Sequence, residues 1–189
     1  LKSTSQISNF NKEFDNFQVP NSAELISITQ NETSVGYTFN PSEIKKIREN
    51  NPDKLIALDL VSAVPATPVD LTLVDTAYFS VQKCFGLPAG MGVWIVGPKC
   101  FEVSKEKESK NEIVGSYHSL SKLKKSGDKN QTPETPNILS LYLLKNVLRD
   151  MQYKGIQSIH NETKYKSALI YQIFDQTSKL KPIIPQLFN

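Results

Sequence analysis

The sequence of 189 residues has few of the residues that mark several classes of protein. It has two cysteines, Cys84 and Cys100, whose spacing fits neither a zinc site nor the disulfide framework of a small secreted domain. No apolar run approaches the roughly 18 residues of a membrane span, and the first residues lack the charged and then apolar pattern of a signal peptide. We therefore expect two reduced thiols in a cytoplasmic protein that does not associate with membranes.

The sequence also has no strong excess of charge of either sign. The formal net charge is +3, and the lysines are spread along the chain except in two runs, at residues 105–110 and 122–129. No aromatic residues are interleaved with these runs, so they are typical of solvated surfaces and do not indicate a nucleic-acid partner. The two histidines, His118 and His160, are isolated, and no metal site is predicted.

What the sequence does contain is an alternation of short apolar runs with helical patterns. Hydrophobic residues make up 39% and charged residues 22% of the chain, as in an ordinary globular domain. The apolar runs at residues 24–30, 54–60, 74–81 and 92–97 predict strands. Asn40, Pro41 and Glu43 predict a capped helix over residues 40–50. This order favours an α/β fold with a mostly parallel sheet, and the close spacing of the last two strands suggests one antiparallel member.

The second half of the chain has a different pattern. Residues 104–132 are polar and rich in lysine and serine, and we expect a long loop that is functional or contacts a partner. Apolar residues then recur at helical spacing from Ile138 to Met151, and Gly155 is a stop signal. A second helix is predicted over residues 156–178.

Polar residues follow three of the predicted strands, where open α/β sheets bind their ligands. The first strand is followed by Asn31, Glu32, Thr33 and Ser34, the second ends with Asp59 and Ser62, and the third with Gln82 and Lys83. A lysine amine, a carboxylate and a hydroxyl that converge in this way are what a pyridoxal phosphate (PLP) site requires. A structural ion pair between Asp59 and Lys83 is the alternative.

Four segments carry a more specific resemblance. The segments "ITQNETSVG", "LDLVSAVPATPVD", "YFSVQKCFGLPAGMGVWIV" and "TPETPNILSLYLLKNVLRDM" resemble, in order and spacing, segments of the class V PLP-dependent aminotransferases, and among them most closely the phosphoserine aminotransferases. The resemblance extends from about Glu24 to Tyr153. It implies part of the large domain of a fold-type I PLP-dependent transferase, with residues 1–155 in the PLP-binding large domain and residues 156–189 forming a helix that leads toward a small domain.

The resemblance implies a role for each candidate site residue. Lys83 matches the Schiff-base lysine and is the catalytic residue. Gln82 matches a contact to the cofactor phosphate, Asp59 the carboxylate that faces the pyridine nitrogen, and Thr33 the hydroxyl on the phenolate oxygen. Ser62 lies near Asp59 and is included among the cofactor-binding residues.

Thr135 matches a threonine that crosses a two-fold interface to the phosphate in the neighbouring subunit, so the resemblance implies a homodimer. The family commonly has Thr-Pro-Asn-Thr-Pro here, whereas this chain has Glu134 in place of the asparagine. A carboxylate beside a phosphate would be repulsive.

Simpler interpretations remain open for several of these residues. Lys83 could be an exposed lysine at a strand end, Asp59 could cap a turn, and Thr33 and Thr135 could be helix N-caps. Cys84 beside the lysine suggests a desulfurase, but the nucleophile of those enzymes lies far downstream, so we expect Cys84 to be structural.

The implied activity is transfer of an amino group from phosphoserine or a similar amino acid to a 2-oxo acid such as 2-oxoglutarate, which belongs to serine biosynthesis. A serine or alanine–glyoxylate aminotransferase would share the same residues. The chain starts without Met and lacks the family's phosphate-binding turn, stacking aromatic residue and substrate-binding arginine. We therefore expect a fragment of a longer protein, or a truncated and non-catalytic form of the fold.

Overall fold

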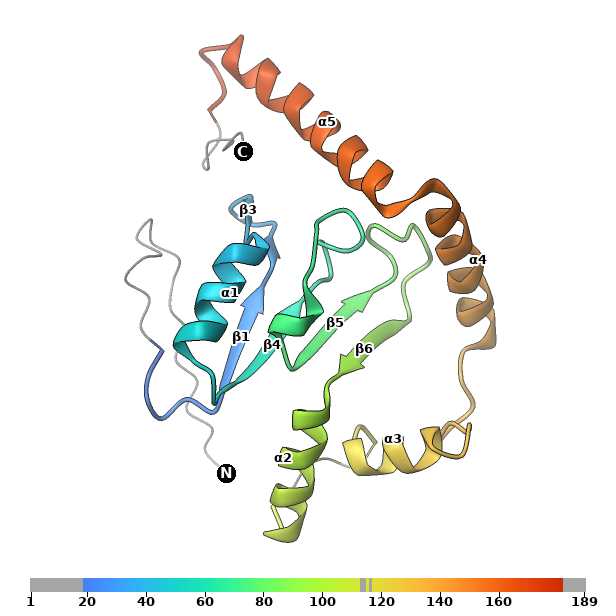
Figure 1. The fold of residues 1–189 in the computed structure, drawn as a ribbon. Helices are drawn as coiled ribbons and strands as arrows, with labels where there is room; N and C mark the ends of the chain where they lie inside the picture. Colours follow the sequence, from blue (N-terminus) through green and yellow to red (C-terminus); the bar gives the residue numbers. More distant parts are fainter. Residues whose placement is uncertain (1–18, 113–114, 116, 182–189) are drawn as a thin grey trace.

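The computed structural model describes residues 19–112, 115 and 117–181, and four strands form its central sheet (Figure 1). The strands are β1 (Leu25–Thr29), β4 (Leu55–Asp59), β5 (Thr76–Ser80) and β6 (Gly92–Val96), and a separate hairpin joins β2 (Asn31–Glu32) to β3 (Tyr37–Thr38). The helices are α1 (Pro41–Asn50), the 3-10 turn η2 (Leu71–Leu73), α2 (Pro98–Ser109), α3 (Leu120–Gly127), α4 (Ile138–Lys154) and α5 (Ile156–Asp175).

The sheet has the strand order β1-β4-β5-β6. β1 pairs with β4 and β4 with β5 in parallel, whereas β6 runs antiparallel to β5. The predicted mostly parallel sheet with one antiparallel member is therefore confirmed. The carboxyl ends of β1, β4 and β5 lie along one side of the sheet, which we call the strand-end edge.

Helix α1 covers one face of this sheet. Its start is the predicted capping box, in which the Asn40 side chain accepts from the Glu43 amide at 3.1 Å and the Glu43 carboxylate accepts from the Asn40 amide at 2.8 Å. Ile44 and Ile47 lie one turn apart on the buried side of α1. They pack on inward-facing residues of β1 and β4, which form the main core: Ile26, Ile28, Ile56 and Leu58.

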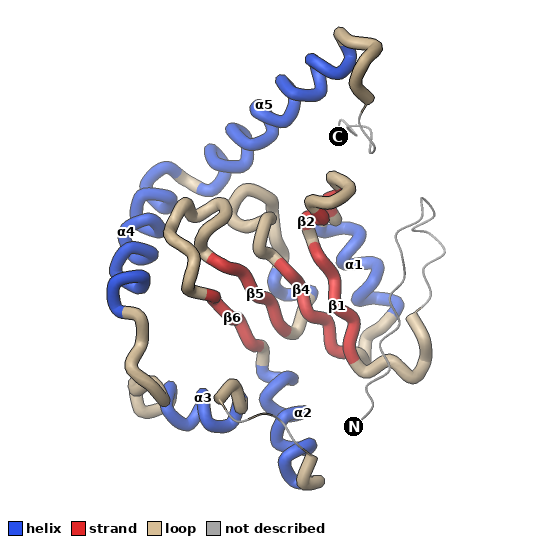
Figure 2. The backbone as a smooth tube through the Cα atoms, turned by 180° about the vertical axis from the view of Figure 1, so that it is seen from behind, coloured by secondary structure: helices blue, strands red, loops and turns tan. Residues whose placement is uncertain are grey.

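The opposite face of the sheet has no helix across it among the described residues, as the reverse view in Figure 2 shows. Large side chains on this face and at its ends are exposed to solvent, with 52% of Leu25, 38% of Tyr78 and 43% of Trp94 accessible. Sheets that are mainly parallel usually have both faces covered. One face of this sheet is therefore unpartnered within the described chain.

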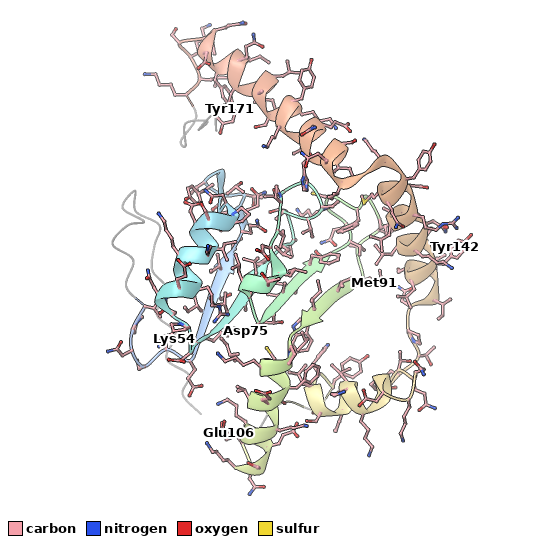
Figure 3. All side chains as sticks on the ribbon, in the orientation of Figure 1. Lys54, Asp75, Met91, Glu106, Tyr142 and Tyr171 are labelled. Atoms are coloured by element: carbon pink, nitrogen blue, oxygen red, sulfur yellow. The ribbon has the colours of Figure 1, made fainter. Side chains whose placement is uncertain are left out.

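Helix α4 packs against the loop that follows β5. Leu144 of α4 forms a second buried cluster with Val81 and Phe85. The outer side of α4 is open, since Leu139 and Tyr142 are exposed and Tyr142 points away from the sheet in Figure 3. Helix α5 extends away from the sheet in both ribbon views (Figures 1 and 2). Among the described helices, none combines the length and the apolarity that crossing a bilayer requires.

The prediction of a long loop over residues 104–132 is wrong, because α2 and α3 occupy much of this range. Helix α2 starts with Pro98 after the N-cap Gly97, and it buries Cys100 and Ser104, which are one turn apart. Glu108 then accepts hydrogen bonds from the Ser119 and Ser121 hydroxyls, at 3.3 and 2.7 Å, and so joins α2 to the start of α3. Helix α2 buries only these two small side chains and α3 buries none, so neither helix has the buried apolar stripe that identifies a helix in sequence.

The end of the sheet opposite the strand-end edge is closed by an ion pair between Arg48 and Asp75. The Arg48 guanidinium donates to Asp75 Oδ2 at 2.5 Å and to the carbonyls of Leu73 and Lys54, both at 2.9 Å. Asp75 Oδ2 also accepts from the Ile56 amide at 2.7 Å. Lys54 and Asp75 mark this end of the sheet in Figure 3. The pair therefore joins α1 to the starts of β4 and β5.

We predict that Arg48→Ala lowers the free energy of unfolding by about 3 kcal/mol, because it leaves the Asp75 carboxylate largely buried and without its charged partner. Denaturant unfolding of the protein measures this loss. Lys45→Ala is the control, since Lys45 forms only an exposed pair with Glu49 at 3.7 Å on the same helix and should change stability by less than about 1 kcal/mol. Equal losses of unfolding free energy in the two variants would show that the Arg48–Asp75 pair stabilises the fold no more than an exposed ion pair does.

Candidate functional site

The loop after β5 presents Lys83 to solvent between two buried anchors. Val81 and Phe85 are buried, whereas Gln82, Lys83 and Cys84 between them are exposed. The Phe85 ring stacks on Phe79 of β5 with 4.8 Å between ring centroids. The Gly86 amide donates to the Lys83 carbonyl at 3.0 Å, and Gly86 has a φ of +66°, which favours glycine. The anchors hold the loop while the amine of Lys83 remains accessible.

Asp59 is the last residue of β4 and is partly buried. Its Oδ1 accepts a hydrogen bond from the Val61 amide at 2.8 Å, so the predicted alternative that Asp59 caps a turn is confirmed. The cap uses only one carboxylate oxygen. It also fixes the orientation of the carboxylate, which is compatible with a second partner on the other oxygen.

Tyr78 lies beside Asp59, as its register partner on the neighbouring strand β5. Burial raises the pKa of the Tyr78 phenol, and the negative charge of Asp59 raises it further. Tyr78 therefore stays a neutral phenol next to the carboxylate at physiological pH. Nothing in the pattern of the sequence indicated this neighbour, because the contact depends on the register between two strands.

Thr33 lies on the turn of the β2–β3 hairpin, directly beyond the end of β1. The carboxylate of Glu32, on one side of Thr33, accepts from the amide of Ser34 on the other side at 2.9 Å and from its hydroxyl at 2.7 Å. These hydrogen bonds lower the pKa of Glu32. Among the described residues the Thr33 hydroxyl has no hydrogen-bond partner. The alternative that Thr33 is a helix N-cap is wrong, because the N-cap of α1 is Asn40.

Ser62 differs from the other candidates because its side chain is already engaged. Its hydroxyl donates to the Asn31 carbonyl at 2.8 Å, and the Asn31 side-chain amide donates to the Ser62 carbonyl at 3.0 Å and to its hydroxyl at 3.3 Å. Asn31 was recognised only as a polar residue after the first strand. Its function in the structure is to connect two of the loops at the strand-end edge.

Thr135 does not join the other candidates within this chain. It lies in the connection between α3 and α4, which runs on the side of the molecule away from the strand-end edge in Figures 1 and 2. The alternative that Thr135 caps α4 is wrong, because the N-cap is Asn137, whose side chain accepts from the Ser140 amide at 3.1 Å. The structure thus brings Thr33, Asp59, Gln82 and Lys83 to one edge and leaves Thr135 apart.

The chemistry of this edge fits PLP. Among the described residues, the amine of Lys83 and the amide of Gln82 have no hydrogen-bond or ion-pair partner, so the predicted alternative of an Asp59–Lys83 ion pair is wrong. An amine, an amide, a hydroxyl and an oriented carboxylate are the donors and acceptors that an aldehyde, a phosphate, a phenolate and a pyridine nitrogen require. No three His, Cys, Asp or Glu side chains in the described ranges gather in a way that could hold a metal ion.

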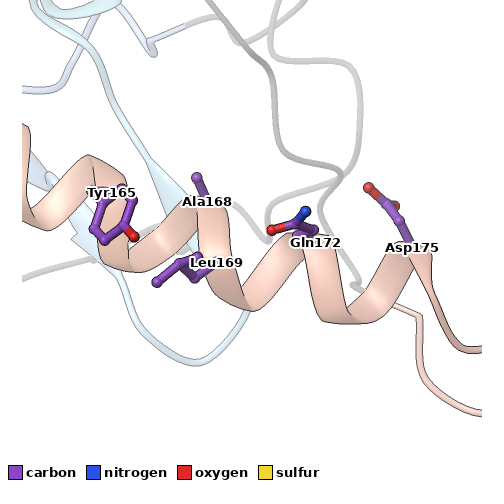
Figure 4. A pocket seen from close by; sticks show the side chains of 5 residues that line it. All are labelled: Tyr165, Ala168, Leu169, Gln172 and Asp175. Atoms are coloured by element: carbon purple, nitrogen blue, oxygen red, sulfur yellow. The ribbon is translucent and has the colours of Figure 1, made fainter.

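A pocket on α5 is a separate feature. The described residues that line it all come from this helix, and they are Tyr165, Ala168, Leu169, Gln172 and Asp175 (Figure 4). It contains no lysine and none of the strand-end residues. The strand-end edge is therefore the better candidate for a catalytic site.

Comparison with known proteins identifies the family of the chain. Residues 10–186 match the family model of the class V aminotransferases, a family that depends on PLP. A phosphoserine aminotransferase from Rhodococcus opacus is 28% identical over 164 residues, which cover 86% of this chain and 43% of the relative. A serine–glyoxylate aminotransferase from Methylorubrum extorquens is 28% identical over 142 residues, with 73% of this chain and 35% of the relative covered.

A solved structure agrees with these sequence matches. The crystal structure of a phosphoserine aminotransferase from Cytophaga hutchinsonii superimposes with a TM-score of 0.83 at 40% identity, covering 90% of this chain and 47% of that one. The chain thus spans less than half the length of the relatives that it matches. It belongs to the class V aminotransferase family, and its fold is that of the PLP-dependent aminotransferases.

Proposed function

We propose that the protein is a PLP-dependent aminotransferase that transfers the amino group of phosphoserine, or of a similar amino acid, to a 2-oxo acid such as 2-oxoglutarate. The observation that carries the proposal is the convergence of Lys83, Asp59 and Thr33 at one sheet edge, in a chain that is 40% identical to a phosphoserine aminotransferase over most of its length. The cytoplasm and a role in serine biosynthesis belong to the same proposal.

Lys83 is the proposed catalytic residue. PLP supplies an aldehyde that captures amino groups and a ring that withdraws electrons from the substrate α-carbon. The Lys83 amine would hold the aldehyde of bound PLP and would give way to the substrate amine. The freed amine would then be the base that moves a proton between the substrate α-carbon and the C4′ carbon of the cofactor. The anchors at Val81 and Phe85 hold the loop in place during this exchange.

The other residues are proposed to orient the cofactor. Asp59 keeps a proton on the pyridine nitrogen, because the carboxylate favours the positive charge there. The Val61 amide fixes the direction of this carboxylate. Thr33 donates to the phenolate oxygen, and Gln82 donates from its amide to the phosphate.

The subunits are proposed to pair as a homodimer in which Thr135 reaches the phosphate of the neighbouring site. Two observations support this: the loop that carries Thr135 lies away from the strand-end edge of its own chain, and Thr135 is exposed there. Glu134 beside it is exposed as well and can turn its carboxylate toward water, away from a phosphate.

The second candidate function is a serine–glyoxylate type of aminotransferase. The match to the Methylorubrum extorquens enzyme, at the same 28% identity as the first relative, favours keeping this alternative. Both functions use the same strand-end residues. Assays of the full-length protein with phosphoserine and 2-oxoglutarate, and with serine and glyoxylate, distinguish the two.

We predict that Lys83→Ala abolishes the visible absorbance that the full-length protein develops with PLP, because Lys83 supplies the amine of the proposed site. Absorbance spectra before and after borohydride reduction measure the bond to the lysine. Lys122→Ala, which removes an exposed lysine from α3, is the control and should leave the band intact. A band that persists in Lys83→Ala and is reduced on another lysine would overturn the assignment.

For Asp59→Asn we expect the rate of amino-group transfer to fall roughly 100- to 1,000-fold, because the amide cannot stabilise a proton on the pyridine nitrogen. The asparagine oxygen can still accept from the Val61 amide, so thermal stability should hardly change. Single-turnover kinetics and thermal unfolding separate these effects. Asp53→Asn, at an exposed turn, is the control and should retain the rate. An unaltered rate in Asp59→Asn would argue against the role of Asp59.

A further inference from the structure

Ser62 lies on one of the three loops that carry the candidate site residues, and it is contacted from the other two. Asn31, two residues before Thr33, bonds to its carbonyl and its hydroxyl. Ser62 itself is on the loop that leaves Asp59. The Cys84 thiol, next to Lys83 in sequence, lies 3.9 Å from the same Ser62 carbonyl, within the range of a weak sulfur hydrogen bond. One residue thus links the loops of Thr33, Asp59 and Lys83.

The hydrogen bonds fix how the Asn31 amide is oriented. The Ser62 carbonyl can only accept, so the group that faces it at 3.0 Å must be the NH2 of Asn31. The Asn31 side-chain oxygen therefore faces the Thr38 hydroxyl, which donates to it at 2.5 Å across the hairpin. The two ends of the Asn31 amide thus hold different elements, since one bonds to β3 and the other to the loop after β4.

These contacts lie beyond the regular pairing of the sheet. Regular pairing of β1 with β4 ends at Thr29 and Asp59, and one further bond joins the Gln30 amide to the Asp59 carbonyl at 3.0 Å. The hairpin beyond has only two residue pairs, between β2 and β3. An isolated pair of strands is marginal in water. Gln30 and the buried Phe39 hold the base of the hairpin. The bonds between Asn31 and Ser62 tie the first strand of the hairpin to the loop that leaves Asp59, and so help to set the position of Thr33 relative to Asp59.

We propose that Asn31 and Ser62 are positioning residues of the cofactor site, and that Ser62 acts through Asn31 and not by touching the cofactor. We call the three bonds between them the Asn31–Ser62 latch. The latch sets the Thr33 hydroxyl relative to the Asp59 carboxylate, so that both can meet one rigid ring. This inference rests on the proposed function, and it reassigns Ser62 from the cofactor-binding residues to which the sequence assigned it.

Loss of the latch has consequences that differ from a general loss of stability. If the hairpin moves, Thr33 no longer donates reliably to the phenolate oxygen, and the pH at which the visible band titrates changes. The affinity for PLP also falls, because the free protein must order the hairpin when the cofactor binds. A residue that only stabilised the fold would alter neither quantity once the protein is folded.

The test uses the full-length protein and PLP as the probe. Asn31→Ala, Ser62→Ala and the double variant are compared with the unaltered protein by spectroscopic titration of PLP and by pH titration of the visible band. Each single variant should bind PLP about tenfold more weakly and shift the midpoint of the band. The double variant should be little worse than either single variant, because both substitutions remove the same latch.

Conservative and control variants sharpen the test. Ser62→Thr keeps a hydroxyl and should recover most of the affinity, whereas Asn31→Asp keeps the shape but places an oxygen opposite the Ser62 carbonyl and should bind as weakly as Asn31→Ala. Asn51→Ala removes an amide that donates to the Ile47 carbonyl at 2.9 Å, far from the strand-end edge, and should lower stability only. Hydrogen exchange of the cofactor-free protein should show faster exchange of the hairpin amides in Asn31→Ala and Ser62→Ala.

Three results would overturn the inference. The first is a pair of single variants that retain both PLP affinity and band midpoint. The second is a double variant whose losses are the sum of the single losses, which would mean that Ser62 contacts the cofactor independently of Asn31. The third is unchanged hydrogen exchange in the hairpin. If the unaltered protein forms no visible band with PLP, the proposed function fails, and the exchange data still decide whether the latch orders the hairpin.

Discussion

The arrangement of the strand-end edge depends on hydrogen-bond partners for the backbone N–H and C=O groups of the loops that leave the strands. Parallel pairing brings three strand ends together, but it provides no partners for the chain beyond them. Gln30 supplies several of these partners from a fully buried position. The backbone amide of Gln30 donates to the Asp59 carbonyl at 3.0 Å, and its backbone carbonyl accepts from the Phe39 amide at 2.7 Å. Its side-chain amide donates to the Pro68 carbonyl at 2.8 Å. The hairpin, the end of β4 and the loop before η2 thus meet at one residue, through both its backbone and its side chain.

The Asn31–Ser62 latch lies next to Gln30 in sequence and completes this connection on the exposed side. Gln30 therefore joins the loops from a buried position, and its neighbour Asn31 joins them from a partly buried position. Two of the side chains proposed to bind the cofactor, Lys83 and Thr33, have no hydrogen-bond partner in the part of the chain that the structure describes. This separation suits a binding site. The groups that hold the loops keep their hydrogen bonds, and the groups that meet the ligand break no hydrogen bond within the protein when they bind it.

How much of this could be predicted from sequence follows from the range of the interactions. The four sheet strands, α1, α4 and α5 were predicted, because local signals define them: apolar runs, the capping box at Asn40 and the stop at Gly155. Helices α2 and α3 were missed, because α2 buries only Cys100 and Ser104 and α3 buries no residue, so neither has a buried apolar stripe. The polar residues after three strands indicated the position of the site, whereas their individual roles, and Thr135, came from resemblance to a family. The role of Asn31 could not be predicted, because its partner lies 31 positions away and the bond exists only once β1 and β4 are paired.

The described residues provide one side of a site and do not enclose it. Lys83 and Gln82 are exposed, and the sheet face that carries Tyr78 and Trp94 has no helix across it in this part of the chain. Proton transfer by an amine and charge stabilisation by a carboxylate both become more effective when water is excluded. A working site at this edge therefore needs cover from outside the described residues. The proposed homodimer would supply some of it, since the loop between α3 and α4 lies away from its own edge and is exposed for contact with a neighbour.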